Sequence, residues 1–152
     1  MKVDEWNDAY AGEVATWHYE PPYDFYDLAS DPADAVEMRD PSRAGHFRAV
    51  LADGSDVLDA FWYFDWSEDA VEVGIGLRPD LTGRGLGESF LRAQLDYAAD
   101  AWSPTTFRLF VAAWNERATR LYERLGFREV DRETRSFELV GEHEFVRMER
   151  AL

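Results

Sequence analysis

Three glycines stand at alternate positions, Gly83, Gly85 and Gly87, between a proline-marked turn and a stretch with helical periodicity, Glu88–Leu95. The N–H groups in the first turn of a helix lack intrahelical acceptors, and the helix dipole adds about half a positive charge there. Glycine leaves room for an anion to reach the bare main chain. The spacing therefore predicts an anion-binding loop suited to a phosphate group.

The residues before this loop predict the strand that leads into it. Val71, Val73, Ile75 and Leu77 alternate with other residues, which is typical of a strand with one buried face. Glu72 points to the opposite face. The strand should stop at Pro79, and the helix that starts at Gly85 should run to about Trp102, where Ser103-Pro104 ends it.

A second segment with regular spacing follows further along the chain. Thr105–Ala113 reads as a strand, parallel to the Val71 strand because one helix connects the two. Asn115–Leu125 then reads as an amphipathic helix that ends at Gly126. Its apolar stripe consists of Ala118, Leu121, Tyr122 and Leu125.

The remaining elements complete one α+β (α/β) unit with a mixed sheet, which we expect to form a single domain over residues 1–152. Asp53-Gly54 favours a tight reversal between two strands. The expected elements are a helix over Trp6–Tyr19 capped by Asp4, short helices at Tyr23–Leu28 and Pro32–Met38, a hairpin of His46–Ala52 with Val57–Trp66, and closing strands Phe127–Asp131 and Phe145–Glu149 with Gly141-Glu142 in the turn.

Composition excludes several classes of function. The 31 acidic and 16 basic residues give a formal charge of −15, which repels nucleic acids. Cysteine is absent, which excludes disulfides and thiolate metal sites, and the histidines His18, His46 and His143 show no metal-ligand spacing. No apolar stretch is long enough for a membrane span and no secretory signal is visible, so we expect a cytoplasmic protein. A salt-adapted proteome and a GC-rich genome would each account for the acidic, lysine-poor composition.

Two motifs together resemble the GNAT superfamily of N-acetyltransferases. Thr82-x-x-Gly85-x-Gly87 resembles its acyl-CoA loop. The family's motif begins with Gln or Arg, continues with two variable residues, Gly and one variable residue, and ends with Gly or Ala. Thr82 departs from the first position of that motif. Asn115, Ala118, Tyr122 and Gly126-Phe127 are similar to its second signature. The resemblance implies a GNAT-type mixed, mostly antiparallel sheet with a central parallel, splayed strand pair flanked by helices.

The same resemblance implies a site for acetyl-CoA. The main chain of Ile75, Gly76 and Leu77 would bind the pantetheine arm and polarise the thioester, helped by the missing side chains of Gly74 and Gly76. Asn115 would bind the same arm, unless it serves only as a helix cap. Tyr122 would protonate the departing thiolate, unless it is only a core residue. The pyrophosphate would bind at Gly83, Arg84, Gly85, Leu86, Gly87 and Glu88, with Arg78 as a further candidate.

The resemblance leaves the base and the acceptor open. The strand Leu109–Val111, where some family members carry a glutamate, is apolar here, so Glu72 becomes the candidate base, acting through a water. We expect direct attack by a primary amine of a small molecule or peptide in a ternary complex, with a non-catalytic acyl-CoA sensor as the alternative. A homodimer is also an option. Aromatic and acidic residues of the N-terminal third either pack a helix pair or attract a cationic amine, with Glu20, Asp24 and Asp27 as possible anchors.

Overall fold

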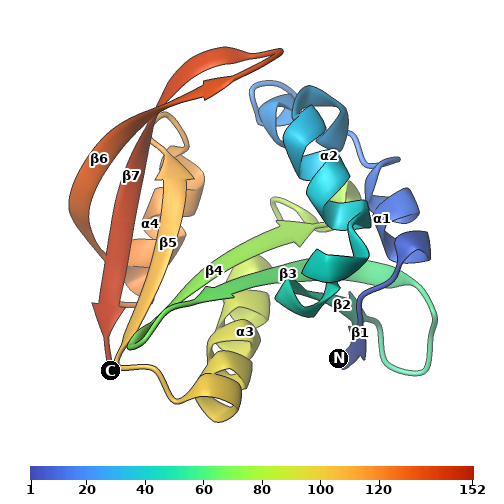
Figure 1. Ribbon diagram of the computed structural model, residues 1–152, viewed down its shortest axis with the longest axis horizontal. Helices are drawn as coiled ribbons and strands as arrows, with labels where there is room; N and C mark the ends of the chain where they lie inside the picture. Colours follow the sequence, from blue (N-terminus) through green and yellow to red (C-terminus); the bar gives the residue numbers. More distant parts are fainter. The chain divides into compact units, whose positions relative to one another are not determined.

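The computed structural model describes residues 1–152 as eleven helices and strands joined by turns and short 3₁₀ segments. None of the helices is both long and apolar enough to cross a membrane. In chain order (Figure 1) the elements are β1 (Lys2–Glu5), α1 (Asp8–Val14), α2 (Pro32–Arg39), β2 (Phe47–Leu51), β3 (Leu58–Trp66), β4 (Ala70–Leu77), α3 (Gly87–Trp102), β5 (Thr106–Ala112), α4 (Glu116–Arg124), β6 (Arg128–Phe137) and β7 (Gly141–Ala151).

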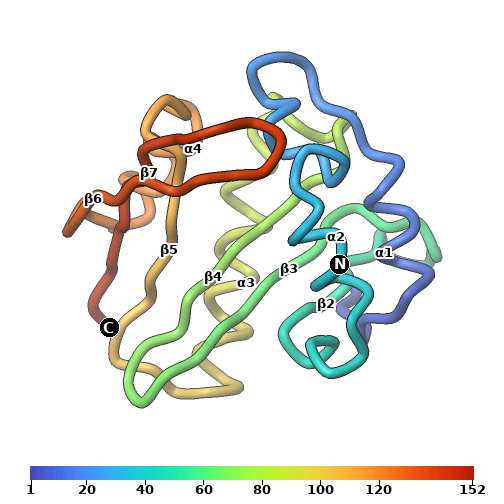
Figure 2. The backbone as a smooth tube through the Cα atoms, turned by 45° about the horizontal axis from the view of Figure 1, so that its top comes forward, coloured from blue at the N-terminus to red at the C-terminus, as the bar shows by residue number.

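The seven strands form one mixed sheet in the order β1-β2-β3-β4-β5-β7-β6. The pairs β1–β2, β2–β3 and β5–β7 are antiparallel, whereas β4 and β5 are parallel. Helix α3 forms the crossover between the two parallel strands (Figure 2). The predicted mixed, mostly antiparallel sheet with a central parallel pair is confirmed.

Two compact units make up the chain, and neither is a continuous segment. The first consists of Met1–Tyr63, Ile75–Gly83 and Phe137–Gly141, and the second of Phe64–Gly74, Arg84–Ser136 and Glu142–Leu152. The candidate site residues of the first unit are Ile75, Gly76, Leu77, Arg78 and Gly83, together with the possible acceptor anchors Glu20, Asp24 and Asp27. Those of the second unit are Glu72, Arg84, Gly85, Leu86, Gly87, Glu88, Asn115 and Tyr122.

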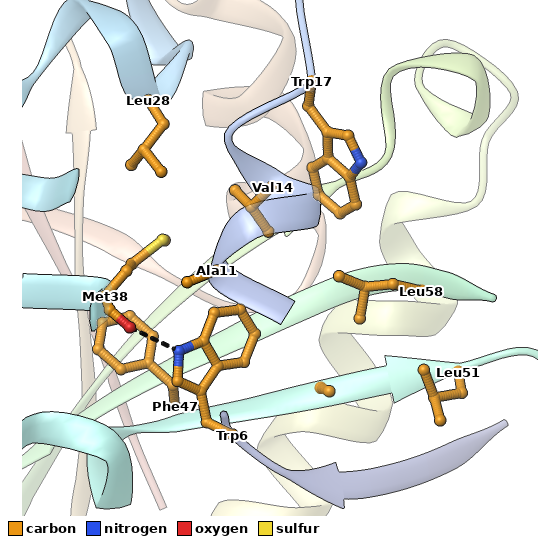
Figure 3. Close-up of a cluster of buried hydrophobic side chains, with 10 residues drawn as sticks. Trp6, Ala11, Val14, Trp17, Leu28, Met38, Phe47, Leu51 and Leu58 are labelled. Atoms are coloured by element: carbon orange, nitrogen blue, oxygen red, sulfur yellow. Dashed lines mark hydrogen bonds between the residues drawn. The ribbon is translucent and has the colours of Figure 1, made fainter. Parts of the chain in front are cut away.

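The first unit is built on a cluster of buried apolar side chains around α1 (Figure 3). Trp6 lies within it, and its indole Nε1 donates a hydrogen bond to the Met38 carbonyl at 2.9 Å. Burial of such large side chains is the main favourable term in folding. The cluster consists of Trp6, Ala11, Val14, Trp17, Leu28, Met38, Phe47, Ala49, Leu51 and Leu58.

The second unit buries alternate residues of β5, namely Phe107, Leu109 and Val111, as expected for a strand with one face in a core. Helix α3 presents a buried stripe at steps of three and four, formed by Phe90, Leu91, Gln94, Leu95 and Ala98. The end of α3 packs through aromatic rings, with Trp102 lying 4.9 Å from Phe64 and 5.1 Å from Trp66 between ring centroids.

The N-terminal helix differs from the prediction in its start, its end and its cap. Residues Lys2–Glu5 form β1, and α1 covers only Asp8–Val14. Asn7 caps the helix by accepting a hydrogen bond from the Tyr10 N–H at 3.1 Å, whereas Asp4 accepts one from the Tyr10 hydroxyl. Trp6 and Trp17, which the predicted helix included, lie outside α1, although both are buried in the core.

The closing hairpin is longer than predicted, and its turn lies earlier in the chain. Strands β6 and β7 cover Arg128–Phe137 and Gly141–Ala151, so residues 138–140 form the turn and Gly141-Glu142 begins β7. Other predictions are confirmed within two residues: the hairpin around Asp53-Gly54, β4, β5, and the end of α3 before Pro104.

Candidate functional site

The start of α3 carries main-chain donors that the protein itself does not use. No side chain caps this helix, and the N–H groups of Gly85–Ser89 donate no hydrogen bond to another backbone group. By contrast, Asn7, Asp31 and Asn115 cap α1, α2 and α4 with their side chains. The bare first turn of α3 can therefore accept an anion.

The loop before α3 needs glycine for its backbone conformation. Gly83 and Gly85 have φ angles of 72° and 74°, in the left-handed region, and no atom lies within 4 Å of where a Cβ would be. At Gly87, a Cβ would lie 3.1 Å from Leu121 Cδ2 of α4. The first turn of α3 is thus in close contact with the helix that carries Tyr122.

The cations around this loop differ in their availability. Arg84 is exposed, and its side chain forms no ion pair. Arg78 forms ion pairs with Asp80 at 2.6 Å and Asp59 at 3.0 Å, so much of its charge is neutralised. The Thr82 hydroxyl donates to the Pro79 carbonyl at 2.7 Å and closes the preceding turn. Arg84 is therefore the cation best able to meet an anion there.

In the second unit, the pairing of β4 with β5 is short. It runs from Ala70 opposite Thr106 to Glu72 opposite Arg108, although both strands continue beyond this point. Past the last pair, the fully buried Gln94 of α3 donates its side-chain amide to the Gly74 carbonyl at 2.8 Å. A side chain of α3 thus donates a hydrogen bond to a β4 carbonyl that lies beyond the pairing of β4 with β5.

In the first unit, packing explains the glycine at position 76. A Cβ there would lie 2.5 and 2.9 Å from Cζ and Cδ1 of Phe61, and closer still to Cε1. The neighbouring Ile75 and Leu77 are half-buried. Gly76 therefore faces an aromatic ring. Its packing against Phe61 alone explains why this residue is a glycine.

Asn115 and Tyr122 lie at the two ends of one helical stretch. Asn115 is buried, and its Oδ1 accepts from the Ala118 N–H at 3.1 Å, so it caps α4 as one interpretation predicted. Tyr122 is half-buried, and its ring packs edge-on against Phe127 with centroids 6.3 Å apart. The Tyr122 carbonyl accepts from the Phe127 N–H at 3.0 Å, which fixes the turn after the helix.

Glu72 is half-buried among charges of both signs. Burial raises the pKa of its carboxyl, Arg135 and Arg108 oppose the shift, and the charges of Asp65 and Glu133 add to it. Arg108 is itself paired with Glu149 at 2.8 Å. A carboxyl with a raised pKa is better matched to proton transfer than an exposed one.

Glu72→Gln is expected to stabilise the protein at neutral pH. Because the folded-state pKa is raised, the folded protein keeps this proton to higher pH than the unfolded chain does. The stability of the wild type therefore falls as the pH rises from the unfolded-state pKa of Glu72 to its folded-state pKa. Glutamine resembles the protonated carboxyl and does not titrate, so the variant does not lose this stability. Urea unfolding at several pH values should show a gain near neutrality that disappears below about pH 4.

The exposed Glu123→Gln of α4 is the control for this experiment, since that carboxylate forms no ion pair. A loss of stability in Glu72→Gln at neutral pH would mean that attraction to the two arginines outweighs burial.

The three candidate acceptor anchors, Glu20, Asp24 and Asp27, differ in their surroundings. Asp27 is occupied within the protein, since its Oδ1 accepts from the Tyr19 N–H at 2.8 Å and its Oδ2 lies 3.1 Å from His18 Nδ1. Glu20 and Asp24 are exposed. Asp27 therefore has a structural role, and the other two stay predictions as acceptor anchors.

Comparison with known sequences identifies one family over most of the chain. The profile described as "Acetyltransferase (GNAT) domain" matches residues 4–128. The mycothiol acetyltransferase of Nocardiopsis dassonvillei is 34% identical over 122 residues, which cover 80% of this chain and 32% of that protein. The mycothiol acetyltransferase of Corynebacterium aurimucosum is 33% identical over 102 residues, covering 64% and 31%. The chain spans about a third of the length of these relatives.

Solved structures of acetyltransferases share the fold. The spermidine N-acetyltransferase of Vibrio cholerae in complex with CoA and spermine superimposes with a TM-score of 0.68 at 20% identity, covering 99% of this chain and 94% of that one. A GNAT-family acetyltransferase from Bacillus anthracis gives a TM-score of 0.75 at 12% identity, covering 98% and 93%. At such identities the likeness establishes the architecture alone.

Proposed function

Because the chain belongs to the GNAT family of acetyltransferases, we propose that it transfers an acetyl group from acetyl-CoA to a primary amine by direct attack in a ternary complex. The observation that carries this proposal is the uncapped start of α3, whose free N–H groups follow the glycine loop inside the matched residues. That arrangement supplies donors for a pyrophosphate without any side chain.

The proposed acetyl-CoA contacts follow the chain from the end of β4 into α3. The main chain of Ile75–Leu77 holds the pantetheine arm and polarises the thioester carbonyl. The N–H groups of Gly83–Glu88 bind the pyrophosphate, with Arg84 adding a charged contact. Asn115 contributes to the pantetheine arm while it caps α4.

The proposed chemistry needs two proton transfers. The amine nitrogen forms a bond to the thioester carbon while the carbon–sulfur bond breaks, so the amine loses a proton and the sulfur gains one. Glu72 accepts the first proton through a water, and Tyr122 donates the second. A phenol has a pKa of about 10 and a thiol about 8.5, so the donation is not strongly driven and depends on alignment.

We propose a small amine as the acceptor. Relatives are named for mycothiol, and a structural neighbour is named for spermidine and was solved with spermine. These names favour a small-molecule amine and support no single compound. A cytoplasmic location, a homodimer and a single domain over residues 1–152 stay predictions from the sequence.

Two measurements test this function. Calorimetry should show binding of acetyl-CoA and none of ATP or NAD. Detection of free thiol should then show CoA release that depends on an amine, tested with polyamines, aminoglycosides, amino-acid derivatives and peptide N-termini. Binding of acetyl-CoA without release in the presence of any amine would favour the acyl-CoA sensor, and the absence of binding would reject both.

Arg84→Ala is expected to weaken CoA binding by about 1–3 kcal/mol, the scale of a charged hydrogen bond. Because Arg84 has no partner in the protein, its removal leaves no buried charge behind. The matched control is Arg120→Ala, which removes an exposed arginine paired with Glu116 on α4. Calorimetry with CoA measures both variants, and unchanged affinity in Arg84→Ala would leave the main chain as the sole anion contact.

A further inference from the structure

A tyrosine from the N-terminal part of the chain is hydrogen-bonded to the end of β4. The hydroxyl of Tyr19 donates a hydrogen bond to the Leu77 carbonyl at 2.6 Å, within the first unit. The two residues are 58 positions apart in the sequence. Leu77 is the last residue of β4, and the next N–H, that of Arg78, donates to the Asp59 carbonyl of β3 at 2.8 Å. The end of β4 is therefore held both by a neighbouring strand and by a side chain.

Tyr19 is itself fixed in place by Asp27. The Asp27 carboxylate accepts from the Tyr19 N–H and contacts His18, so both its oxygens are used to fold the segment that carries the tyrosine. Burial raises the pKa of the Tyr19 hydroxyl, and the charge of Asp27 adds to the effect. The phenol therefore keeps its proton and stays a hydrogen-bond donor at neutral pH.

The segment that carries Tyr19 also packs against Phe61, the residue that faces Gly76 of β4. Trp17, two residues before Tyr19, stacks on Phe61 with centroids 6.2 Å apart. Phe61 in turn fills the space where a side chain at Gly76 would lie. Two side chains of one loop thus support the end of β4. Tyr19 bonds to Leu77 directly, and Trp17 packs against the ring that faces Gly76.

We propose that Tyr19 is a positioning residue for acyl-CoA, holding the Leu77 carbonyl so that the main chain of Ile75–Leu77 keeps the conformation that binds the pantetheine arm. The inference rests on the proposed function, because it assigns that main chain to acyl-CoA. Tyr19 acts through Leu77 and has no contact with the reacting atoms in this scheme. Tyr19 lies outside both motifs that resemble the family, Thr82–Gly87 and Asn115–Phe127.

The test compares two variants that each remove one tyrosine hydroxyl from the first unit. Tyr19→Phe loses the bond to Leu77, whereas Tyr10→Phe loses a bond of equal length, 2.6 Å, to the carboxylate of Asp4. Calorimetry with CoA is expected to show about three- to tenfold weaker binding for Tyr19→Phe, as the loss of one hydrogen bond implies. Tyr10→Phe should bind CoA within about twofold of the wild type.

A second readout does not depend on CoA. Amide hydrogen exchange at Arg78 should be faster in Tyr19→Phe than in the wild type and unchanged in Tyr10→Phe, since only the first variant loosens the end of β4. Wild-type affinity in Tyr19→Phe, or equal weakening in both variants, would overturn the positioning role and leave the proposed function intact. A wild type that binds no CoA would overturn both.

Discussion

Tyr122→Phe is expected to lower turnover by about 10²- to 10⁴-fold, the usual contribution of a general acid. Phenylalanine keeps the ring that packs against Phe127 and the carbonyl that accepts from its N–H, so the fold around α4 should persist. In the proposed mechanism, the variant lacks the hydroxyl that protonates the departing thiolate. The rate of CoA release at saturating acetyl-CoA and amine measures the effect, and calorimetry should find nearly unchanged CoA affinity.

Tyr97→Phe provides the matched control. Tyr97 is also half-buried on a helix of the second unit, with its ring stacked 5.6 Å from Phe64. This variant should retain wild-type turnover. If Tyr122→Phe turned over acetyl-CoA at the wild-type rate, the tyrosine would be only a packing residue of α4, and another group or water would have to protonate the thiolate.

Gly76→Ala should be a strongly damaging single-methyl change in β4. The added carbon would overlap the ring of Phe61, which also packs against the rings of Trp17 and Trp6, with centroids 6.2 and 6.1 Å away. Overpacking of this kind costs about 1–3 kcal/mol. We expect a lower urea midpoint and, because Gly76 is in the proposed pantetheine segment, weaker CoA binding.

Gly45→Ala is the control for this change, since that glycine is exposed and no atom lies within 4 Å of its Cβ position. A double variant separates overlap from other causes. In a Phe61→Ala background the ring is gone, so Gly76→Ala should cost much less, and the coupling energy of the cycle should be at least about 0.5 kcal/mol. Additive effects would show that the ring is not what limits position 76.

Turns, helix ends and helix caps that depend on neighbouring residues could be predicted from the sequence. Asp53-Gly54 favours a reversal, and Gly54 indeed has a φ of 68° between β2 and β3. Ser103 before Pro104 ends α3 in the left-handed region, with a φ of 46°. Asn115 caps α4 with its own side chain. Each of these signals acts within a few residues, so the chain alone predicts it.

Elements that depend on distant partners were missed or shortened. Strand β1 pairs residue by residue with β2, from Lys2 opposite Leu51 to Glu5 opposite Arg48, yet its own sequence has no alternation of apolar residues. Strand β6 is exposed along most of its length and rich in charge, so no apolar pattern marks its extent. Pairing across the sheet, rather than local preference, defines both.

In the candidate site, too, features set by neighbouring residues could be predicted, whereas contacts between distant residues could not. The glycine loop and the Asn115 and Tyr122 motifs could be found by spacing, but the supporting contacts could not. Gln94 did leave a signal, since it is a polar residue on the buried stripe of α3, and a buried amide needs a partner. Tyr19 left none, because its acceptor at Leu77 is a main-chain atom far along the sequence.

The division of the chain into two units limits how the protein could be dissected. The chain passes from one unit to the other after Tyr63, Gly74, Gly83, Ser136 and Gly141, and four of these passages fall within or at the end of a strand. No single cleavage or truncation can therefore release either unit whole, and an expressed fragment would carry pieces of both. The remaining passage, after Gly83, lies in the glycine loop, where Gly83 and Arg84 are both exposed, so a nick there would also leave each fragment with pieces of both units.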